Sequence, residues 1–316
     1  MPRVRLVLSA VAVLAVAAGV LLTTQTSHAT FRGQNGRLLF EANVGHNTQL
    51  FTIKPDGSGL MQITRFKDSG GSNGNWSKDG SRIVFTRHWD PGGPAEKLVL
   101  YTVNADGSRL RAIGRAGNLA VGPNWFPNGR RIVFLDVAGG GDHGGRLMVI
   151  GADGAGLRPA GVTGDGGDSA CVLGNGRVAF LRSKPTNGDL TAIFIARLFG
   201  KGLKRVTSWG GHADKIDCSP DGKRIVYSAP AFGQDGRSSN VYTMKTDGTG
   251  VVQLTHHTGG SVNAGADSWS PDGAKIAYVS NKSGTYQIWT MNADGSKQTQ
   301  LTKGAESHLA AWGSHP

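Results

Sequence analysis

A short phrase recurs six times along this 316-residue chain, and it limits the possible folds more than any other feature. Each copy is a glycine-containing turn followed by a basic residue and an apolar run, as in "PDGAKIAY" around Gly273. The turn glycines stand 44 to 51 residues apart, at Gly36, Gly80, Gly129, Gly176, Gly222 and Gly273. A regular period of this length indicates an array of similar structural units.

Each unit is predicted to contain four strands, here named a to d. Strand a ends at a Trp position, the first turn leads into strand b, a variable loop precedes strand c, and a second Asp-Gly turn leads into strand d. Four strands at this period are typical of a β-propeller blade. The chain begins its repeats at a strand b and ends in "HLAAWGSHP", a strand a. We therefore expect an all-β, six-bladed propeller of four-stranded antiparallel blades, closed by N- and C-terminal strands that share one blade.

The stretch "WSPDGAKIAYVS…IWTMNADGS…QLT" closely resembles the TolB-like propeller repeat, which is also called WD40-like or PD40. The resemblance covers residues from about Gly33 to Pro316, so we expect one propeller domain over 33–316. It implies an exported protein of the cell envelope that binds other proteins. TolB carries an additional α/β domain before its propeller, and prolyl peptidases carry a hydrolase domain after theirs. We expect neither domain here.

The N-terminal residues are predicted to be a secretory signal peptide over 1–29. Arg3 and Arg5 precede an apolar run, Leu6–Leu22, and Ser27 and Ala29 are small residues suited to cleavage after Ala29. An uncleaved membrane anchor is the alternative, because the apolar run is long for a leader. The predicted location is the periplasm or the extracellular space.

The charge of the chain favours anionic partners. The net charge of +12 becomes +10 once Arg3 and Arg5 are removed with the leader. An anionic envelope polymer is therefore a possible partner, whereas the export signal and the lack of basic clusters with interleaved aromatics argue against nucleic acid. Cys171 and Cys218 fall at nearly the same point of adjacent repeats, so they form either one bridge between neighbours or two buried thiols. We expect a monomer.

Functional residues are expected in the segments that the repeat does not preserve. Both turns of every blade should lie on one face of the ring, the turn face, and the b–c and d–a loops on the other, the loop face. Every histidine except His28 and His315 is expected in a loop of the loop face, and the Gly-rich stretch 70–74 is expected in a d–a loop. The candidate binding residues are His88, Trp89, Asp90, His143, Trp209, His212, Asp214, His256, His257, Asp267, Glu306 and His308.

Two functions are compatible with these residues. The first is a binding or scaffold module for a protein partner, without catalytic residues or cofactor. The alternative is a metal-dependent polysaccharide lyase or hydrolase, in which imidazoles and carboxylates hold a divalent metal at the channel mouth. Secreted polysaccharide lyases with related propellers use histidines and a metal in this way, and this resemblance is the reason for the alternative.

Two further sets of residues follow the repeat. The large flat side chains of Trp76, Trp125, Trp269 and Trp312 are expected to pack between blades. A basic residue follows the first turn of every blade, where it either pairs with a turn aspartate or contributes to an anion-binding ring. These basic residues are Arg37, Arg82, Arg131, Arg177, Arg224 and Lys275.

Overall fold

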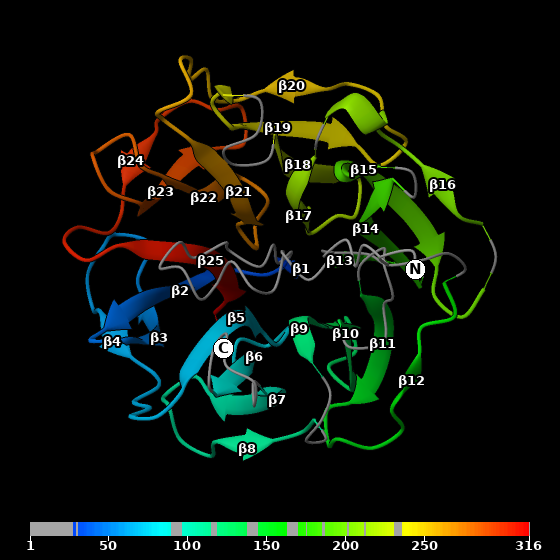
Figure 1. The fold of residues 1–316 in the computed structure, drawn as a ribbon. Helices are drawn as coiled ribbons and strands as arrows, with labels where there is room; N and C mark the ends of the chain where they lie inside the picture. Colours follow the sequence, from blue (N-terminus) through cyan, green and yellow to red (C-terminus); the bar gives the residue numbers. More distant parts are fainter. Residues whose placement is uncertain are drawn as a thin grey trace, which may run out of the picture.

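Six antiparallel sheets stand around a central axis in the computed structural model, and the ring is closed (Figure 1). The structure describes residues 28–29, 31–89, 97–114, 119–137, 145–162, 170–174, 176–184, 187–200, 202–211, 213–230 and 236–315. The described ranges contain no α-helix and include the 3-10 turn η3 (Trp209–Gly211), and no helix there is long and apolar enough to span a membrane. The predicted all-β six-bladed propeller is confirmed.

The blades are numbered here from the one that contains both chain ends, and each is given from its inner strand outward. Blade 1 consists of β25 (Ser307–Ser314), β2 (Asn35–Val44), β3 (Asn47–Ile53) and β4 (Met61–Gln62). Blade 2 consists of β5 (Gly70–Trp76), β6 (Arg82–Trp89), β7 (Lys97–Asn104) and β8 (Arg111–Ala112). Blade 3 consists of β9 (Ala120–Trp125), β10 (Arg131–Asp136), β11 (Arg146–Gly151) and β12 (Arg158–Pro159).

The second half of the ring repeats this order. Blade 4 consists of β13 (Ala170–Leu173), β14 (Arg177–Lys184), β15 (Asn187–Arg197) and β16 (Lys204–Arg205). Blade 5 consists of β17 (Asp214–Cys218), β18 (Arg224–Ala229), β19 (Asn240–Lys245) and β20 (Val252–Gln253). Blade 6 consists of β21 (Ala264–Trp269), β22 (Lys275–Ser280), β23 (Gln287–Asn292) and β24 (Thr299–Gln300).

The first turn of a blade is built by a serine and an aspartate acting together. In blade 6, Ser270 donates its hydroxyl to Asp272 Oδ1 at 2.6 Å and accepts the Lys275 amide at 2.8 Å. Gly273 has φ +74°, which a residue with a Cβ rarely adopts, and its amide donates to the Ser270 carbonyl at 2.8 Å. Blades 2 and 5 repeat the Ser–Asp bond, from Ser77 to Asp79 and from Ser219 to Asp221.

The turn aspartates are therefore committed to the turn. Among the described residues, none of them forms an ion pair with the basic residue that follows the first turn, which was one of the two alternatives. Lys275 Nζ donates instead to Asn292 Oδ1 at 3.2 Å. Arg82 lies over the Trp125 ring of the next blade, 4.8 Å from its centroid. Arg37 Nε donates to Thr52 Oγ1 at 2.9 Å. The basic residue thus packs along its own or a neighbouring blade.

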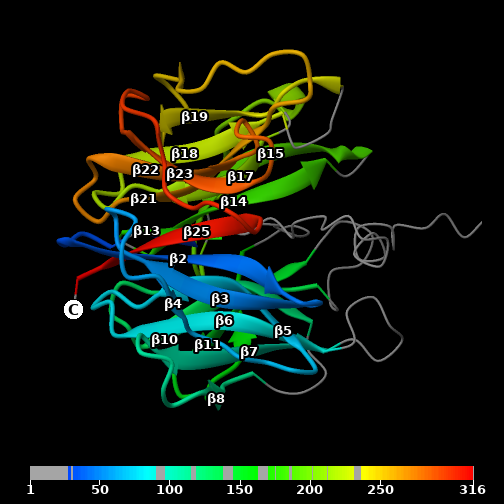
Figure 2. The same cartoon turned by 90° about the vertical axis from the view of Figure 1, so that its left-hand side faces the viewer.

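Blade 1 confirms the predicted closure, because strands from both ends of the chain pair within it: β25 lies beside β2 (Figure 2). Trp312 on β25 is opposite Leu38 on β2, and its indole Nε1 donates to the Gly36 carbonyl at 3.2 Å. His315 adds a backbone bond to the Gln34 carbonyl at 2.9 Å. The pairing leaves no open sheet edge at the point where the ring closes.

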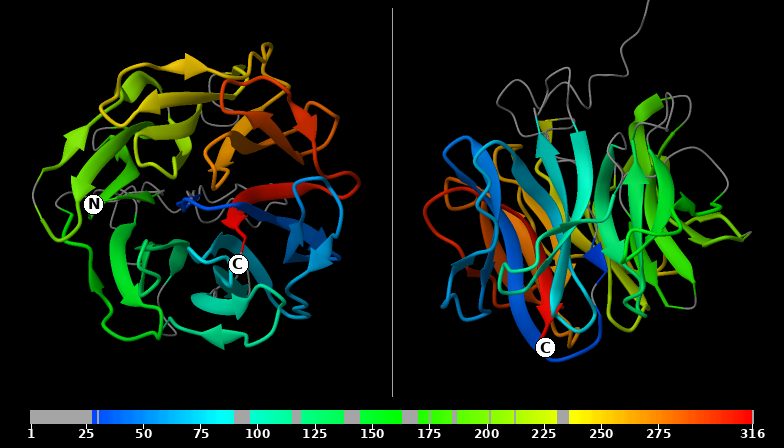
Figure 3. Two further views of the ribbon diagram at one scale, coloured as in Figure 1. Left: turned by 180° about the vertical axis from the view of Figure 1, so that it is seen from behind. Right: turned by 90° about the horizontal axis from the view of Figure 1, so that it is seen from below.

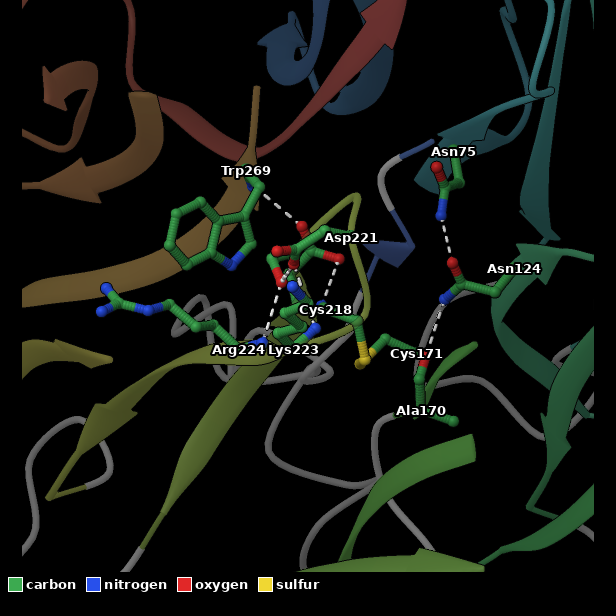
Figure 4. Close-up of a disulfide and its surroundings, with 11 residues drawn as sticks. Asn75, Asn124, Ala170, Cys171, Cys218, Asp221, Lys223, Arg224 and Trp269 are labelled. Atoms are coloured by element: carbon green, nitrogen blue, oxygen red, sulfur yellow. Dashed lines mark hydrogen bonds between the residues drawn. A yellow bond between two sulfur atoms is a disulfide. The ribbon is translucent and has the colours of Figure 1, made fainter. Parts of the chain in front are cut away.

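The inner strands of neighbouring blades are joined directly at every junction. Trp76, Trp125, Trp269 and Trp312 are at most 4% exposed, which confirms their position between blades. Where blades 4 and 5 lack this Trp, the disulfide Cys171–Cys218 joins β13 to β17 with a Cα–Cα distance of 5.7 Å (Figure 4). The other five junctions are bridged by hydrogen bonds: Trp76 Nε1 to Ala311 O, Asn75 Nδ2 to Asn124 Oδ1, Asn124 Nδ2 to Ala170 O, Trp269 N to Asp217 Oδ2, and Trp312 N to Ser268 Oγ.

A two-residue strand, β1 (His28–Ala29), lies at the centre of the ring beside β17 (Figures 1 and 3). It pairs in parallel with β17, with His28 opposite Asp217 and Ala29 opposite Cys218. Phe31 then enters the core at 8% exposure, and its carbonyl accepts the Ser314 hydroxyl at 3.3 Å. Cleavage after Ala29 would separate β1 from the propeller; the signal peptide remains a prediction.

The outer parts of the blades are held by the second turn. In four blades the glycine of this turn lies against a backbone carbonyl of the preceding blade, and a Cβ there would lie at most 3.0 Å from the carbonyl oxygen. Gly248 shows this most closely: it has φ +93°, and a Cβ there would overlap the Val206 carbonyl oxygen of blade 4. Gly107, Gly154 and Gly295 have the same position in their blades, against Ile63, Ile113 and Leu254.

Replacing Gly248 with alanine tests this contact between blades. We expect both Gly248→Ala and a control variant, Gly284→Ala, to lower the free energy of unfolding. The loss in Gly248→Ala should be larger by about 1 kcal/mol or more. Gly284 is the control because it has φ +104° with open space around its Cβ position, so it carries the backbone strain without the clash. Urea denaturation measures both, and equal losses would show that the blade contact costs nothing.

Removal of the disulfide should weaken the junction between blades 4 and 5. The bond closes a separation of 47 residues, and such a bond typically contributes about 2–4 kcal/mol. We expect a fall of that size in Cys171→Ser/Cys218→Ser, measured by denaturation. Because the chain has two cysteines, thiol titration of the unfolded, unreduced protein provides the check. Two free thiols would refute the bond.

Candidate functional site

Irregularities in the inner strands decide which side chains meet in the middle of the ring. Pairing of the inner strand with strand b shifts register by one residue in five blades, on β5, β9, β17, β21 and β25. Asn73, Lys215 and Leu309, with φ of +58°, +42° and +48°, lie at three of these shifts. A β-bulge bends the strand and redirects the extra residue.

Three residues at these shifts, Asn73, Lys215 and Asp267, lie in a polar group that also includes Glu41 and His308. We call this group of five residues the channel cluster. Lys215 Nζ lies 3.6 Å from Asp267 Oδ1, and both side chains are fully buried. Glu41 Oε1 accepts the backbone amide of Asn73 across the junction of blades 1 and 2. His308 is opposite Glu41 in the register of β2 and β25. The cluster therefore joins blades 5, 6, 1 and 2 through charged and polar side chains.

Burial has the largest effect on the pKa values of Glu41 and His308 in the channel cluster. Burial raises the pKa of Glu41 to about 8, and the nearby Asp267 charge acts in the same direction. The Asn73 amide and the Lys215 charge oppose this rise. Burial and the charge of Lys215 lower the pKa of His308, while Glu306, 3.6 Å from its Nε2, acts the other way. At neutral pH the cluster thus holds a Lys–Asp ion pair beside a largely neutral carboxyl and a neutral imidazole.

The predicted convergence of the candidate residues in loops at one mouth is only partly observed. Asp267 and His308 belong to the channel cluster, but both lie on inner strands. The other members, Glu41, Asn73 and Lys215, were not among the candidates. The stretch 70–74, expected in a loop, is part of β5.

The remaining described candidates are distributed around the ring. His88 lies on β6 and its ring covers Gly70, and burial lowers the pKa of His88 to about 4. Asp214 is buried at the start of β17. His257 is held by Asn240, whose Oδ1 accepts its amide at 2.7 Å, while His256 is exposed. Asp90, His143 and His212 lie outside the described residues.

The described part of the chain contains no group of three or more His, Cys, Asp or Glu side chains placed to hold a metal ion. The channel cluster contributes two carboxylates and one imidazole, but Lys215 occupies the position beside Asp267. A bound cation there would have to compete with the ammonium group. The cluster is therefore better suited to structural support than to metal ligation.

Three tryptophans outside the inter-blade positions each lie under a cation. The Arg87 guanidinium is 4.4 Å from the Trp89 ring centroid, and it also covers Phe66 at 4.1 Å. The Lys282 ammonium is 3.9 Å from the centroid of Trp289 in blade 6. Further around the ring, Arg205 lies 5.4 Å from Trp209 of η3. We call these three pairs the Trp–cation stacks.

The Trp–cation stacks lie toward the loop face. Strand β6 starts at the first turn, on the turn face, so its last residue, Trp89, lies at the opposite end, toward the loop face. Trp209 belongs to η3, which lies in the d–a segment after blade 4. Lys282 lies in the b–c loop of blade 6, and the Trp289 indole donates to the carbonyl of Ser280, the last residue of β22. All three tryptophans are partly buried. Blades 2, 4 and 6 thus each carry one stack.

Known proteins share this architecture. Residues 176–315 match the family model of the TolB beta propeller domain. TolB from Acinetobacter baumannii superposes with a TM-score of 0.70 and 17% identity, over 88% of this chain and 66% of that protein. Residues 176–315 thus match the TolB propeller model, and the chain as a whole has the TolB-like propeller fold.

In two further comparisons, the match covers a larger share of the other protein's length. A putative TolB from Agrobacterium tumefaciens has a TM-score of 0.66 and 15% identity to this TolB-like propeller, over 86% of this chain and 92% of that one. An uncharacterized protein from Agrobacterium fabrum is 28% identical over 238 residues, which are 72% of this chain and 71% of that protein. At identities of 15–17% the solved structures establish the fold alone.

The buried carboxyl of this TolB-like propeller gives a pH-dependent stability. The folded-state pKa of Glu41, about 8, exceeds its ordinary value of 4.5. Between these values the folded chain holds a proton that the unfolded chain has released, so raising the pH favours unfolding. The stabilisation is complete below pH 4.5 and lost as pH rises through 8. Glu41 thus lowers the free energy of unfolding by at most about 1.4 kcal/mol per pH unit in this window.

Glu41→Gln should remove this part of the pH dependence, because a neutral amide oxygen still accepts the Asn73 amide. Denaturation at pH 5, 6, 7 and 8 compares the variant with the wild type, and Asp153→Asn serves as the control on an exposed acid in the second turn of blade 3. All three proteins keep every histidine. Identical pH dependence in wild type and Glu41→Gln would contradict the raised pKa.

Proposed function

We propose that this TolB-like propeller is an exported binding or scaffold module that holds a protein partner on its loop face. The observation that carries the proposal is the placement of the Trp–cation stacks on blades 2, 4 and 6, at the loop-face side of the ring. Tryptophan, tyrosine and arginine dominate the binding energy of protein interfaces. Stacked side chains are already ordered, so they lose little conformational freedom when a partner binds.

The stack of blade 2 illustrates why such a surface suits a protein partner. Arg87 is held by Ser69, whose hydroxyl accepts its Nε at 3.0 Å, and by Asp68 at 3.5 Å. The side chain of Arg87 is 17% exposed, whereas that of Asp68 is 75% exposed. A rigid aromatic and cationic centre with an exposed acid beside it resembles the core and rim of a protein interface.

The proposed location is the periplasm or the extracellular space, supported by the predicted leader over 1–29 and by the structural likeness to TolB proteins. The enzyme alternative, a metal-dependent lyase or hydrolase, depends on histidines that include His143 and His212. It would need a metal that these loops hold together, whereas the described part of the chain offers no such group.

Partner capture tests the proposed surface. Trp89→Ala, Trp209→Ala and Trp289→Ala are each expected to weaken binding of an envelope protein at least about tenfold, because hot-spot truncations cost more than about 1.4 kcal/mol. The partner is first cross-linked to the wild type in intact cells and identified, and its affinity is then measured with purified proteins. Lys78→Ala on the turn face is the control and should bind normally. Loss of binding in the control with retention in all three Trp variants would place the interface on the opposite face.

Metal analysis separates the binding module from the enzyme. The binding module is expected to purify without stoichiometric Mn, Zn or Ca and to keep its partner affinity in the presence of a chelator. One metal ion per chain that disappears in His212→Ala or His308→Ala would favour the enzyme instead.

A further inference from the structure

A basic pocket of about 390 Å³ opens on the turn face at the junction of blades 4 and 5. We call it the junction pocket. Four cationic side chains line it, together with two carboxylates that belong to the turns of blade 5. These residues are Arg177, Lys223, Arg224, Lys245, Asp221 and Asp247. Figure 4 shows Asp221, Lys223 and Arg224 close to the disulfide, since the turn directly follows Cys218.

The two carboxylates of the junction pocket are already engaged in the turns. Asp221 accepts the Ser219 hydroxyl at 2.7 Å and the Lys223 amide at 3.0 Å. Asp247 accepts the amide and the hydroxyl of Thr249 at 2.8 and 2.7 Å. Within the part of the chain that the structure describes, none of the four lining cations has a carboxylate within 4.0 Å. Four cations against two carboxylates leave the pocket with a formal excess of two positive charges.

Neighbouring residues strengthen this positive field. Arg32 and Lys223 help to lower the pKa of Asp221, although partial burial opposes them and the turn hydrogen bonds contribute more. Lys204 of β16 likewise contributes to the low pKa of Asp247, after the bonds from Thr249 and the charge of Lys245. Blade 4 itself adds no turn acid, because its two turns read "GNG" and "LFGKG" where other blades carry at least one aspartate.

Exposed apolar side chains flank the same junction. Of the seven large apolar residues that are most exposed among the described residues, four belong to the second turns and outer strands of blades 4 and 5. They are Phe199, Leu203, Val251 and Val252, with exposures of 42, 37, 54 and 48%. Gly248 packs these two blades together at Val206, and the stem of Lys245 passes beside Gly250, next to Val251. Val251 and Val252 therefore adjoin the junction pocket, and Leu203 precedes Lys204, whose charge acts on Asp247. Phe199 lies instead at the edge of blade 4 toward blade 3, where its amide donates to the Ala160 carbonyl and Arg158 covers its ring.

We propose that this junction docks onto a lipid membrane, with phosphate headgroups in the junction pocket and the side chains of Leu203, Val251 and Val252 in the interfacial layer. A free phosphate ion would use the pocket alone, and a soluble anionic polymer would leave the apolar side chains in water. An anionic lipid surface uses both features, because basic residues are attracted to its headgroups and apolar side chains enter the acyl boundary. The loop face would then point away from the membrane. The inference is independent of the partner proposed for that face.

Vesicle binding tests the docking surface with the full chain. Co-sedimentation compares vesicles of phosphatidylcholine alone with vesicles that contain one third phosphatidylglycerol. The apolar run 6–22 and its flanking Arg3 and Arg5 are present in every variant, so the readout is the ratio of the two affinities compared between variants. We expect the wild type to favour the anionic vesicles by tenfold to a hundredfold, with a preference that falls as salt is added. Lys223→Gln/Arg224→Gln/Lys245→Gln should remove most of this preference.

Matched variants separate the pocket from general charge and hydrophobicity. Val251→Ser/Val252→Ser should weaken binding to the anionic vesicles at least threefold without changing the salt dependence. Lys54 and Leu60 occupy the positions of Lys245 and Val251 in blade 1, and Lys54→Gln/Leu60→Ser should behave as wild type.

Three results would overturn the proposal. The first is equal anionic preference in the wild type and the triple variant. The second is binding of inorganic phosphate in the pocket without any vesicle preference, which would assign it to a soluble anion. The third is binding of polygalacturonate, lost in the triple variant, with no vesicle preference, which would assign the pocket to an anionic polymer.

Discussion

The six blades depend on one another through the bonds between their inner strands. Each blade alone is a four-stranded sheet with two apolar faces, which is stable only when both faces are covered by neighbours. The inner strands converge on the axis, and there every junction has a direct connection, covalent in one case and hydrogen-bonded in five. Strong bending at the axis explains why five of these strands contain a bulge. The bulges in turn bring charged side chains into the interior.

The channel cluster is thus a consequence of how the ring is built. Lys215 and Asp267 are fully buried because their strands lie in the middle of the molecule, and each neutralises the other. Glu41 has no such cation to itself, so its carboxyl remains protonated to high pH. The outer surface is different. There the repeat leaves its loops and turns free to vary, and the side chains suited to partners are found on the Trp–cation stacks and at the junction pocket.

The sequence was sufficient for the fold because the signals that define a blade are local. A Ser-x-Asp-Gly turn such as 270–273 is specified by four consecutive residues, and its repetition gives the number of blades. The channel cluster was not predictable in the same way. The extra residue of a bulge exists only relative to the partner strand, so nothing in "DKIDC" marks Lys215 as redirected. The Gly-rich start of β5 was read as a loop for the same reason. Of the stacks, Arg87 and Trp89 are two residues apart on one strand, whereas Lys282 and Trp289 meet only through the pairing of β22 with β23.

The closure of blade 1 also bears on when the molecule acquires its structure. The indole of Trp312 bonds to a carbonyl 276 positions earlier in the chain. Contacts between such distant parts of a chain form late, because a large loop must close before they stabilise anything. The chain is synthesised from its N-terminus, so β2 is made early, whereas its inner partner β25 is added only with the last residues. The chain therefore stays open throughout almost all of its synthesis, which is the state in which a chain with the predicted leader would be threaded through a membrane. Export as proposed would let the ring form on the far side, where an oxidising environment can join Cys171 to Cys218.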